Sequence, residues 1–145
     1  GESLKPLEKV ASGGEMSRIM LAFKAIAANA DSIPTLIFDE IDTGISGHIA
    51  AVVGEKMVSI ADNHQVLCVT HLPQIAALAD VHFMVQKQDD GQTTRTSLKR
   101  LEMEERYEYI ARMMSGMEDS KLAYEHAREL ITHSEEIKQK RRKNK

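Results

Sequence analysis

Two short apolar runs, each ending in polar residues, constrain the fold of this chain most strongly. The first reads TLIFDE at 35–40 and the second reads NHQVLCVTH at 63–71. Runs of this length, rich in aliphatic side chains and bounded by Pro34 or polar residues, are typical of strands buried on both faces of a parallel sheet. We therefore expect an α/β domain with a mostly parallel core sheet.

Helical stretches alternate with these strands. Apolar residues recur at steps of three and four, which predicts half-buried helices that flank the sheet and a helical pair near the C-terminus. The expected helices lie at 16–30, 49–60, 72–80, 107–114 and 122–131. VHFMVQK at 81–87 and TTRTSLKRL at 93–101 surround the turn DDGQ, so they predict a hairpin at the sheet edge.

Composition limits the class of protein. The chain has 145 residues, of which 42% are hydrophobic and 28% charged, as is ordinary for one globular domain. No apolar run approaches the roughly 18 to 20 residues of a membrane span, and the start GESLKPLEKV lacks the features of a signal peptide. We expect a cytoplasmic protein with no membrane partner, and a buried thiol at the single cysteine, Cys68.

Charge is concentrated at the C-terminus. Residues 137–145 hold six Lys or Arg and no acid, and removing them takes the formal net charge from −3 to −9. A run of like charge is typical of a solvated, disordered tail, and contact with nucleic acid is the alternative. We therefore divide the chain into a domain at 1–136 and a basic, disordered tail at 137–145.

Polar residues end both expected strands. Asp39 and Glu40 end the first, and Thr70 and His71 end the second. Ligands of open α/β sheets bind at these carboxyl ends. Consecutive strand carboxylates point to different sides, so one could hold Mg²⁺ while the other orients a water beside a terminal phosphate. His71 could donate a ring N–H to that phosphate. Each residue alone also fits a purely structural role at a strand end, and the other five histidines show no metal-ligand spacing.

The segment ASGGE at 11–15 stands directly before the first helical stripe. A helix N-terminus exposes backbone N–H groups that favour phosphate oxygens, and Gly13 and Gly14 would let that backbone approach an anion closely. Ser12 could add a hydroxyl donor. The same residues also fit a capping box, since Ser12 and Glu15 are three residues apart.

The order of these motifs resembles the second half of an ABC-type ATPase head. ASGGE resembles the signature motif, TLIFDE the Walker B strand, IDTGISG at 41–47 the D-loop, and VTH at 69–71 the switch histidine. The segments KVASGGEMSRIMLAFKAI, PTLIFDEIDTGISG, VLCVTHLPQIAALAD and ERYEYIARMMSG are similar to the RecN family of bacterial SMC-like DNA repair ATPases. The similarity covers residues 1 to about 133.

This resemblance implies the C-terminal lobe of an ABC/SMC-type P-loop ATPase head that dimerises around two ATP molecules. Contacts to the γ-phosphate held by the opposite subunit are implied for Ser12, Gly13, Gly14 and Glu15. Asp39 would serve Mg²⁺, Glu40 would act on the attacking water, and His71 would touch the γ-phosphate. Asp42, Gly44 and Ser46 would belong to the D-loop at the dimer seam.

Two residues depart from the common signature motif: Ala11 replaces a frequent Leu, and Glu15 replaces a frequent Gln. Because an acid is hard to place on a phosphate, we expect Glu15 to act at the helix start or as a hinge. A Walker A loop, G-x-x-x-x-G-K-[ST], is absent from the sequence, and so are long coiled-coil heptads. GEKMVS at 54–59 lacks the required glycine and hydroxyl and falls in a helical stripe.

We therefore expect a C-terminal piece of a nucleoid-associated ATPase for double-strand-break repair and recombination of DNA. The implied partners are an N-terminal lobe with the Walker A loop, the second head of a homodimer, and DNA. Without the Walker A lysine we expect the chain alone neither to bind ATP tightly nor to hydrolyse it. The alternatives are a non-enzymatic module that binds DNA or a partner, and the same half of another ABC-class ATPase from a transporter or recombination protein.

Overall fold

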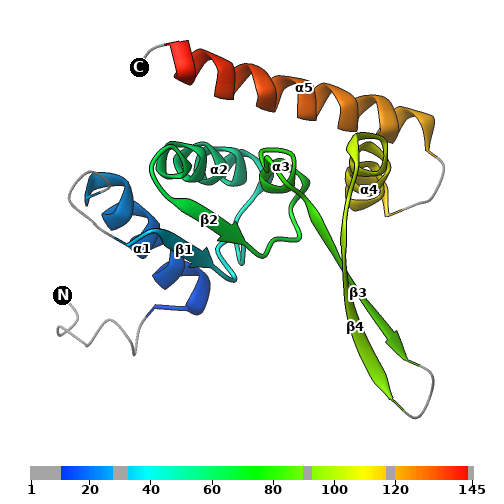
Figure 1. Ribbon diagram of the computed structural model, residues 1–145, viewed down its shortest axis with the longest axis horizontal. Coiled ribbons are helices and arrows are strands. Elements are labelled where there is room, and N and C mark those ends of the chain that lie inside the picture. Colours follow the sequence, from blue (N-terminus) through cyan, green and yellow to red (C-terminus); the bar gives the residue numbers. More distant parts are fainter. Residues whose placement is uncertain (1–10, 28–32, 90–92, 117–119, 144–145) are drawn as a thin grey trace, which may run out of the picture. The chain divides into compact units, whose positions relative to one another are not determined.

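The computed structural model describes residues 11–27, 33–89, 93–116 and 120–143. The chain divides into two compact units, residues 1–75 and 76–145 (Figure 1). None of the described helices is both long and apolar enough to span a membrane. The expected end of the first helix at 28–30 and most of the DDGQ turn fall outside the described residues.

The first unit is built around two parallel strands. It contains α1 (Gly13–Ala27), β1 (Thr35–Phe38), α2 (Gly47–Ala61) and β2 (Gln65–Cys68) in that order. The strands pair in register from Thr35 opposite Gln65 to Phe38 opposite Cys68. The predicted alternation of helices and parallel strands is therefore confirmed, and both polar strand ends lie at one edge.

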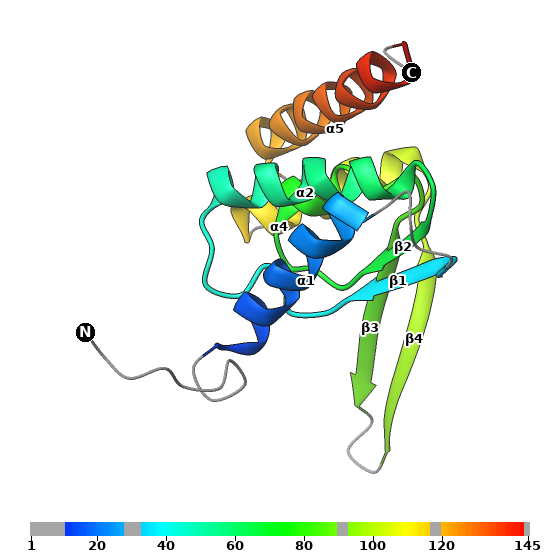
Figure 2. The same cartoon turned by 90° about the vertical axis from the view of Figure 1, so that its left-hand side faces the viewer.

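The core of this unit lies on one face of the strand pair. Figures 1 and 2 both place α2 on one side of β1 and β2. The buried core residues are Leu21, Leu36, Phe38, Ile41, Ala50, Val53, Met57, Ile60 and Ile75. Leu36 and Phe38 point into this core because alternate residues of a strand share a face.

The prediction that these strands are buried on both faces is wrong for this chain. Ile37 is 71% exposed and Leu67 is 47% exposed, and both lie on the face opposite the core. The sequence pattern is that of a fully covered sheet, but the described helices of this unit pack on only one side. A strand pair therefore carries an apolar face that the described part of the chain leaves open.

The expected helix at 72–80 is shorter in the structure, where α3 (Pro73–Ala76) has a single turn. The second unit continues with β3 (Phe83–Asp89), β4 (Thr94–Arg100), α4 (Met103–Ser115) and α5 (Lys121–Lys143). The predicted C-terminal helical pair is confirmed: α4 and α5 share a core of Ala76, Ala77, Ile110, Ala111, Ala123, Ala127 and Ile131.

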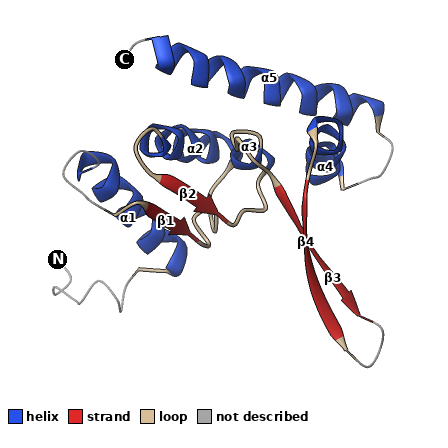
Figure 3. Cartoon of the chain, in the orientation of Figure 1, coloured by secondary structure: helices blue, strands red, loops and turns tan. Residues whose placement is uncertain are grey.

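The predicted hairpin forms, but not at the edge of the parallel sheet. β3 and β4 pair antiparallel from Phe83 opposite Arg100 to Asp89 opposite Thr94 and make a sheet of their own (Figure 3). Every residue of β4 is exposed. The alternating pattern fixes the pairing of the two strands, whereas the place of a hairpin in a larger sheet depends on contacts distant in sequence.

The expected disordered tail is helical as far as the structure describes it, because α5 runs to Lys143. Lys138 Nζ lies 3.0 Å from Asp80 Oδ1 and 2.6 Å from Glu135 Oε1. Lysine and arginine are good helix formers, and positive charge in the last turns of a helix is favoured by the helix dipole. The basic run 137–143 therefore ends a helix in place of forming a separate tail.

Candidate functional site

The turn after β1 carries the two predicted acids. Asp39 and Glu40 follow the last strand residue, Phe38, and Asp39 Oδ1 accepts the Glu40 N–H at 2.9 Å. The Glu40 backbone has φ of 56°, in the left-handed region, and its carbonyl accepts the Thr43 N–H at 3.1 Å. Both acids therefore lie after the end of β1, at the start of the turn, and do not alternate along a strand as predicted. A non-glycine residue with such a backbone is a feature concentrated at functional sites.

The start of α1 is closed by the predicted capping box. Ser12 N–H donates to Glu15 Oε2 at 2.8 Å, and Glu15 N–H donates to Ser12 Oγ at 3.4 Å. The hydrogen bonds from Ser12 lower the pKa of Glu15, and the charge of Arg18 adds to this. Glu15 is thus engaged at the helix start, as its sequence position predicts.

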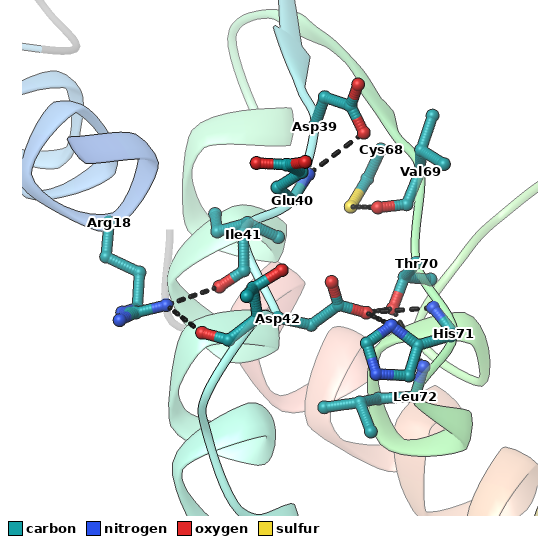
Figure 4. Close-up of polar contacts among 11 residues, drawn as sticks. Arg18, Asp39, Glu40, Ile41, Asp42, Cys68, Val69, Thr70, His71 and Leu72 are labelled. Atoms are coloured by element: carbon teal, nitrogen blue, oxygen red, sulfur yellow. Dashed lines mark hydrogen bonds and ion pairs between the residues drawn. The ribbon is translucent and has the colours of Figure 1, made fainter. Parts of the chain in front are cut away.

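The first turns of α1 contact the turn after β1. Arg18 donates through one guanidinium nitrogen to the carbonyls of Ile41 at 3.1 Å and Thr43 at 2.9 Å (Figure 4). Ser17 Oγ donates to the Asp39 carbonyl at 2.9 Å. These bonds satisfy turn carbonyls that have no ladder partner and hold the turn to the helix.

The two glycines of the signature-like motif have different surroundings. A Cβ on the buried Gly14 would lie 2.8 Å from the Glu40 carbonyl oxygen and 3.0 Å from Thr43 Cβ. A Cβ on the exposed Gly13 would instead lie 2.5 Å from Glu40 Oε2, at the end of a flexible side chain. Gly14 therefore permits close packing of helix and turn, whereas Gly13 presents backbone at the surface beside the Glu40 carboxylate.

Asp42 joins the turn after β1 to the loop after β2. Its carboxylate is 3% exposed, and its Oδ2 accepts the Thr70 hydroxyl at 2.6 Å and the His71 N–H at 2.8 Å. Burial raises the pKa of Asp42, but the hydrogen bonds from Thr70 and His71, together with other local contacts, outweigh it and lower the pKa overall. Asp42 thus faces its own chain.

His71 is held by the same carboxylate through its ring. Nδ1 of His71 lies 3.0 Å from Asp42 Oδ2, while the side chain remains 71% exposed. Glu40 points toward α1, away from His71 (Figure 4). Six of the predicted site residues therefore fall into two neighbouring groups. Gly13, Gly14, Asp39 and Glu40 form one, and Asp42 and His71, joined through Thr70, form the other.

The other two predicted D-loop residues are exposed. Gly44 has φ of 73° and open space around it. Ser46 precedes α2 as its N-cap residue, without a side-chain capping bond. Their place on the surface suits a contact made with another molecule, which the prediction of a dimer seam requires.

Asp39 is the predicted Mg²⁺ ligand. Its side chain is exposed, and Oδ1 accepts the Glu40 N–H. Among the described residues no group of three or more His, Cys, Asp or Glu side chains is gathered for a metal. One accessible carboxylate nevertheless fits Mg²⁺, which keeps several waters and takes its remaining ligands from phosphate.

Cys68 ends β2 beside this site. Burial raises the pKa of its thiol to about 12, and the negative charges of Asp42 and Asp39 contribute further. A thiol in this state is not a nucleophile near neutral pH. The prediction of a buried thiol is met only in part, because Cys68 is half-buried.

Sequence reasoning missed Ser17 and Arg18 and assigned no role to Thr70. Ser17 and Arg18 lie three and four residues after Gly14, so all three share a helix face. That spacing was a usable signal, because a glycine on a helix face marks a close neighbour and polar residues beside it then have a backbone to bind. The apolar stripe alone does not reveal it.

Comparison with known proteins gives a consistent result. No protein-family model matches the chain. The DNA repair protein RecN of Halalkalibacterium halodurans is 49% identical over 138 residues, covering 95% of this chain and 24% of that protein. RecN of Bacillus subtilis is 47% identical over 139 residues, and RecN of Streptomyces coelicolor is 47% identical over 131 residues.

The chain spans about a quarter of the length of these curated relatives. The match lies in their C-terminal part and includes nearly all of this chain. Identity of this level over so long a segment does not arise between unrelated sequences. The 145-residue chain belongs to the RecN family.

Proposed function

We propose that this chain is the C-terminal lobe of an ATP-hydrolysing head in a bacterial DNA repair protein. It would complete an ATP site across a dimer of heads, in the repair and recombination of DNA double-strand breaks. The relatives at 44–49% identity are DNA repair proteins by name. Their greater length supports a larger parent protein, in which the remaining chain supplies the nucleotide-binding loop.

One observation carries the proposal. The capped start of α1 packs against the turn that holds Asp39 and Glu40, with Gly14 against the Glu40 carbonyl and Arg18 bonded to Ile41 and Thr43. The helix start, which we propose binds an anion, and the acidic turn are thereby held in a fixed relation. A helix cap with a purely structural role would not require the neighbouring acid, Glu40, to adopt a left-handed backbone conformation.

In the proposed mechanism the residues of this chain act on a phosphate chain and its attacking water. Bound Mg²⁺ would neutralise charge on the phosphates, and Asp39 would hold it largely through water. Glu40 would orient and polarise the attacking water, and His71 would meet the terminal phosphate or that water. Ser12 and Gly13 would present backbone and hydroxyl donors to a nucleotide carried by the opposite subunit.

The open face of the parallel strands supports the missing N-terminal lobe as a partner. Ile37, Leu67 and Val69 are 71%, 47% and 61% exposed, an unusual run of apolar side chains on adjacent strand segments. The relatives contain about three quarters of their length beyond the matched segment. We assign this face to that lobe, and expect its cover to restore a sheet buried on both sides.

The test is ATP hydrolysis by the parent protein and by this chain. Glu40→Gln in the parent should lower the rate at least 100-fold, as expected when a water-positioning group is lost in phosphoryl transfer, while ATP binding persists. Glu55→Gln, an exposed acid of α2, serves as the matched control and should leave the rate unchanged. The 145-residue chain alone should show no turnover. Full activity of the Glu40→Gln parent would reject the proposal.

A second candidate function is DNA binding without catalysis through the end of α5. Lys140, Arg141, Arg142 and Lys143 all lie in the last turn of that helix. If this region binds DNA, substituting these four residues by Gln should weaken binding and flatten its salt dependence. An unchanged salt slope would exclude it.

A further inference from the structure

His71 has one ring nitrogen engaged and one facing outward. Nδ1 lies 3.0 Å from Asp42 Oδ2, and the same oxygen accepts the His71 backbone N–H at 2.8 Å. The Asp42 side chain is 3% exposed, whereas the His71 side chain is 71% exposed. The imidazole is thus anchored at its inner edge to a buried carboxylate, and Nε2 is the nitrogen on the solvent side.

The loop around the imidazole is fixed by the same acid. Thr70 Oγ1 donates to Asp42 Oδ2 at 2.6 Å and accepts the Leu72 N–H at 3.1 Å. Three consecutive residues are therefore tied directly or indirectly to one side chain (Figure 4). This network limits both the position of the His71 backbone and the rotation of its ring.

An ionised carboxylate can only accept hydrogen bonds, so the ring nitrogen facing it must carry hydrogen. In a neutral imidazole the other nitrogen is then an acceptor, because the bond made by one nitrogen sets the state of the other. With Nδ1 3.0 Å from Asp42 Oδ2, the single N–H of the neutral ring would lie on the Asp42 side. An N–H in that position would not donate to an ionised phosphate oxygen, which is the role that the sequence suggests for His71.

We propose that Asp42 is the positioning residue of His71: it fixes the Nδ1–H tautomer and the ring orientation, so that Nε2 enters the catalytic site as a hydrogen-bond acceptor. Such an acceptor suits the attacking water or a protonated phosphate oxygen. The kinetic part of this inference rests on the proposed ATPase function. The tautomer of His71 is a property of this chain and can be tested without ATP hydrolysis.

The tautomer can be measured on the 145-residue chain by two-dimensional ¹H–¹⁵N correlation of the histidine rings at pH 8. The His71 signals are assigned by their loss in His71→Gln, and the other five histidines serve as internal references. We expect His71 to carry hydrogen on Nδ1 and none on Nε2. A wild-type His71 with hydrogen on Nε2 alone overturns the proposal, whether or not any variant folds.

Two variants sharpen this measurement. Asp42→Ala should release the ring and populate the Nε2–H tautomer. Thr70→Val removes a hydroxyl that donates to Asp42 and accepts the Leu72 N–H, and it should preserve Nδ1–H because Asp42 and the His71 ring remain paired. Retention of pure Nδ1–H in a folded Asp42→Ala chain would show that another group sets the tautomer and would reject the assignment to Asp42.

The kinetic test uses a double-mutant cycle in the parent protein. Asp42→Ala should lower kcat about 10- to 100-fold, as loss of a group that orients a functional histidine commonly does. The Asp42→Ala/His71→Ala double variant should be no slower than His71→Ala alone, because the first residue acts through the second. If the losses of kcat in the two single variants instead multiply in the double variant, the inference is wrong. An inactive wild-type parent would instead remove the proposed function and leave the measured tautomer unaffected.

Discussion

The Glu40 carboxylate lies against the backbone of Gly13, so that a Cβ on Gly13 would stand 2.5 Å from Glu40 Oε2. The proposed water-positioning acid and the proposed nucleotide-contacting glycine of one chain therefore occupy adjoining space. In the proposed head dimer these two residues serve different nucleotides. Through this contact, a change at one proposed ATP site could reach the other within a single subunit.

Gly13→Ala should separate function from stability. The new methyl group meets the end of a flexible side chain, so the free energy of unfolding should change by less than about 0.5 kcal/mol. Displacement of the Glu40 carboxylate should lower kcat of the parent protein by up to about 100-fold. Urea denaturation of the chain and steady-state ATP hydrolysis by the parent measure the two effects. Unchanged hydrolysis would show that Glu40 moves without consequence.

Gly14→Ala should have the opposite balance. Its Cβ would lie 2.8 Å from the Glu40 carbonyl and 3.0 Å from Thr43 Cβ, where helix and turn must separate to admit it. We expect a loss of about 1–3 kcal/mol in the free energy of unfolding, the usual cost of overpacking. Urea denaturation beside Gly13→Ala provides the comparison, and equal stability of the two variants would contradict the packing described.

Glu40→Asn should stabilise the chain. Glu40 has φ of 56°, and asparagine tolerates the left-handed region better than glutamate does. We expect a gain of up to about 1 kcal/mol in the free energy of unfolding, measured by urea denaturation. Glu55→Asn in the middle of α2 is the control and should be slightly destabilising. A loss of stability in Glu40→Asn would mean that contacts of the Glu40 side chain stabilise the fold by more than its left-handed backbone destabilises it.

Asp42 should contribute stability that disappears in acid. Its pKa is lowered in the folded chain, so the unfolded chain binds the proton more tightly, and stability rises with pH until the unfolded carboxyl is ionised. The contribution should be fully present above about pH 5 and lost as the pH falls through the lower pKa of the folded chain. Urea denaturation from pH 7 to pH 3 should show a smaller decline for Asp42→Asn than for the wild type. Parallel declines would contradict this.

Cys68 should resist alkylation in the folded chain. Its pKa is raised to about 12, so at pH 8 the thiolate is roughly a thousandfold less abundant than in an unfolded chain. Iodoacetamide should label Cys68 rapidly in urea and very slowly without it, as followed by mass spectrometry. Fast labelling of the native chain would show that the thiol is more accessible or more acidic than described.

Much of the fold can be predicted from the sequence, because local patterns determine it. The TLIFDE and QVLC segments have the composition of buried parallel strands, and the structure pairs them in register. The Ser12 and Glu15 spacing predicts the capping box that forms. These features depend on residues close together in sequence.

The remaining features depend on neighbours that are distant or outside the chain. Ile37 reads as a core residue, yet it is exposed because the described residues cover only one face of its strand. The sequence places Asp42 in a surface loop, but its carboxylate is buried and accepts hydrogen bonds from Thr70 and His71. Pairings of this kind join residues almost thirty positions apart, and no periodicity encodes them.

Arg18 couples the movement of α1 to that of the turn after β1. Its guanidinium ties the second turn of α1 to the backbone on either side of Asp42, at Ile41 and Thr43. A rotation of α1 must therefore either break these bonds or carry the turn with it. A displacement of Ser12 and Gly13 would therefore also move the turn after β1. That turn positions the Glu40 side chain on one side, and through Asp42 it positions His71 on the other.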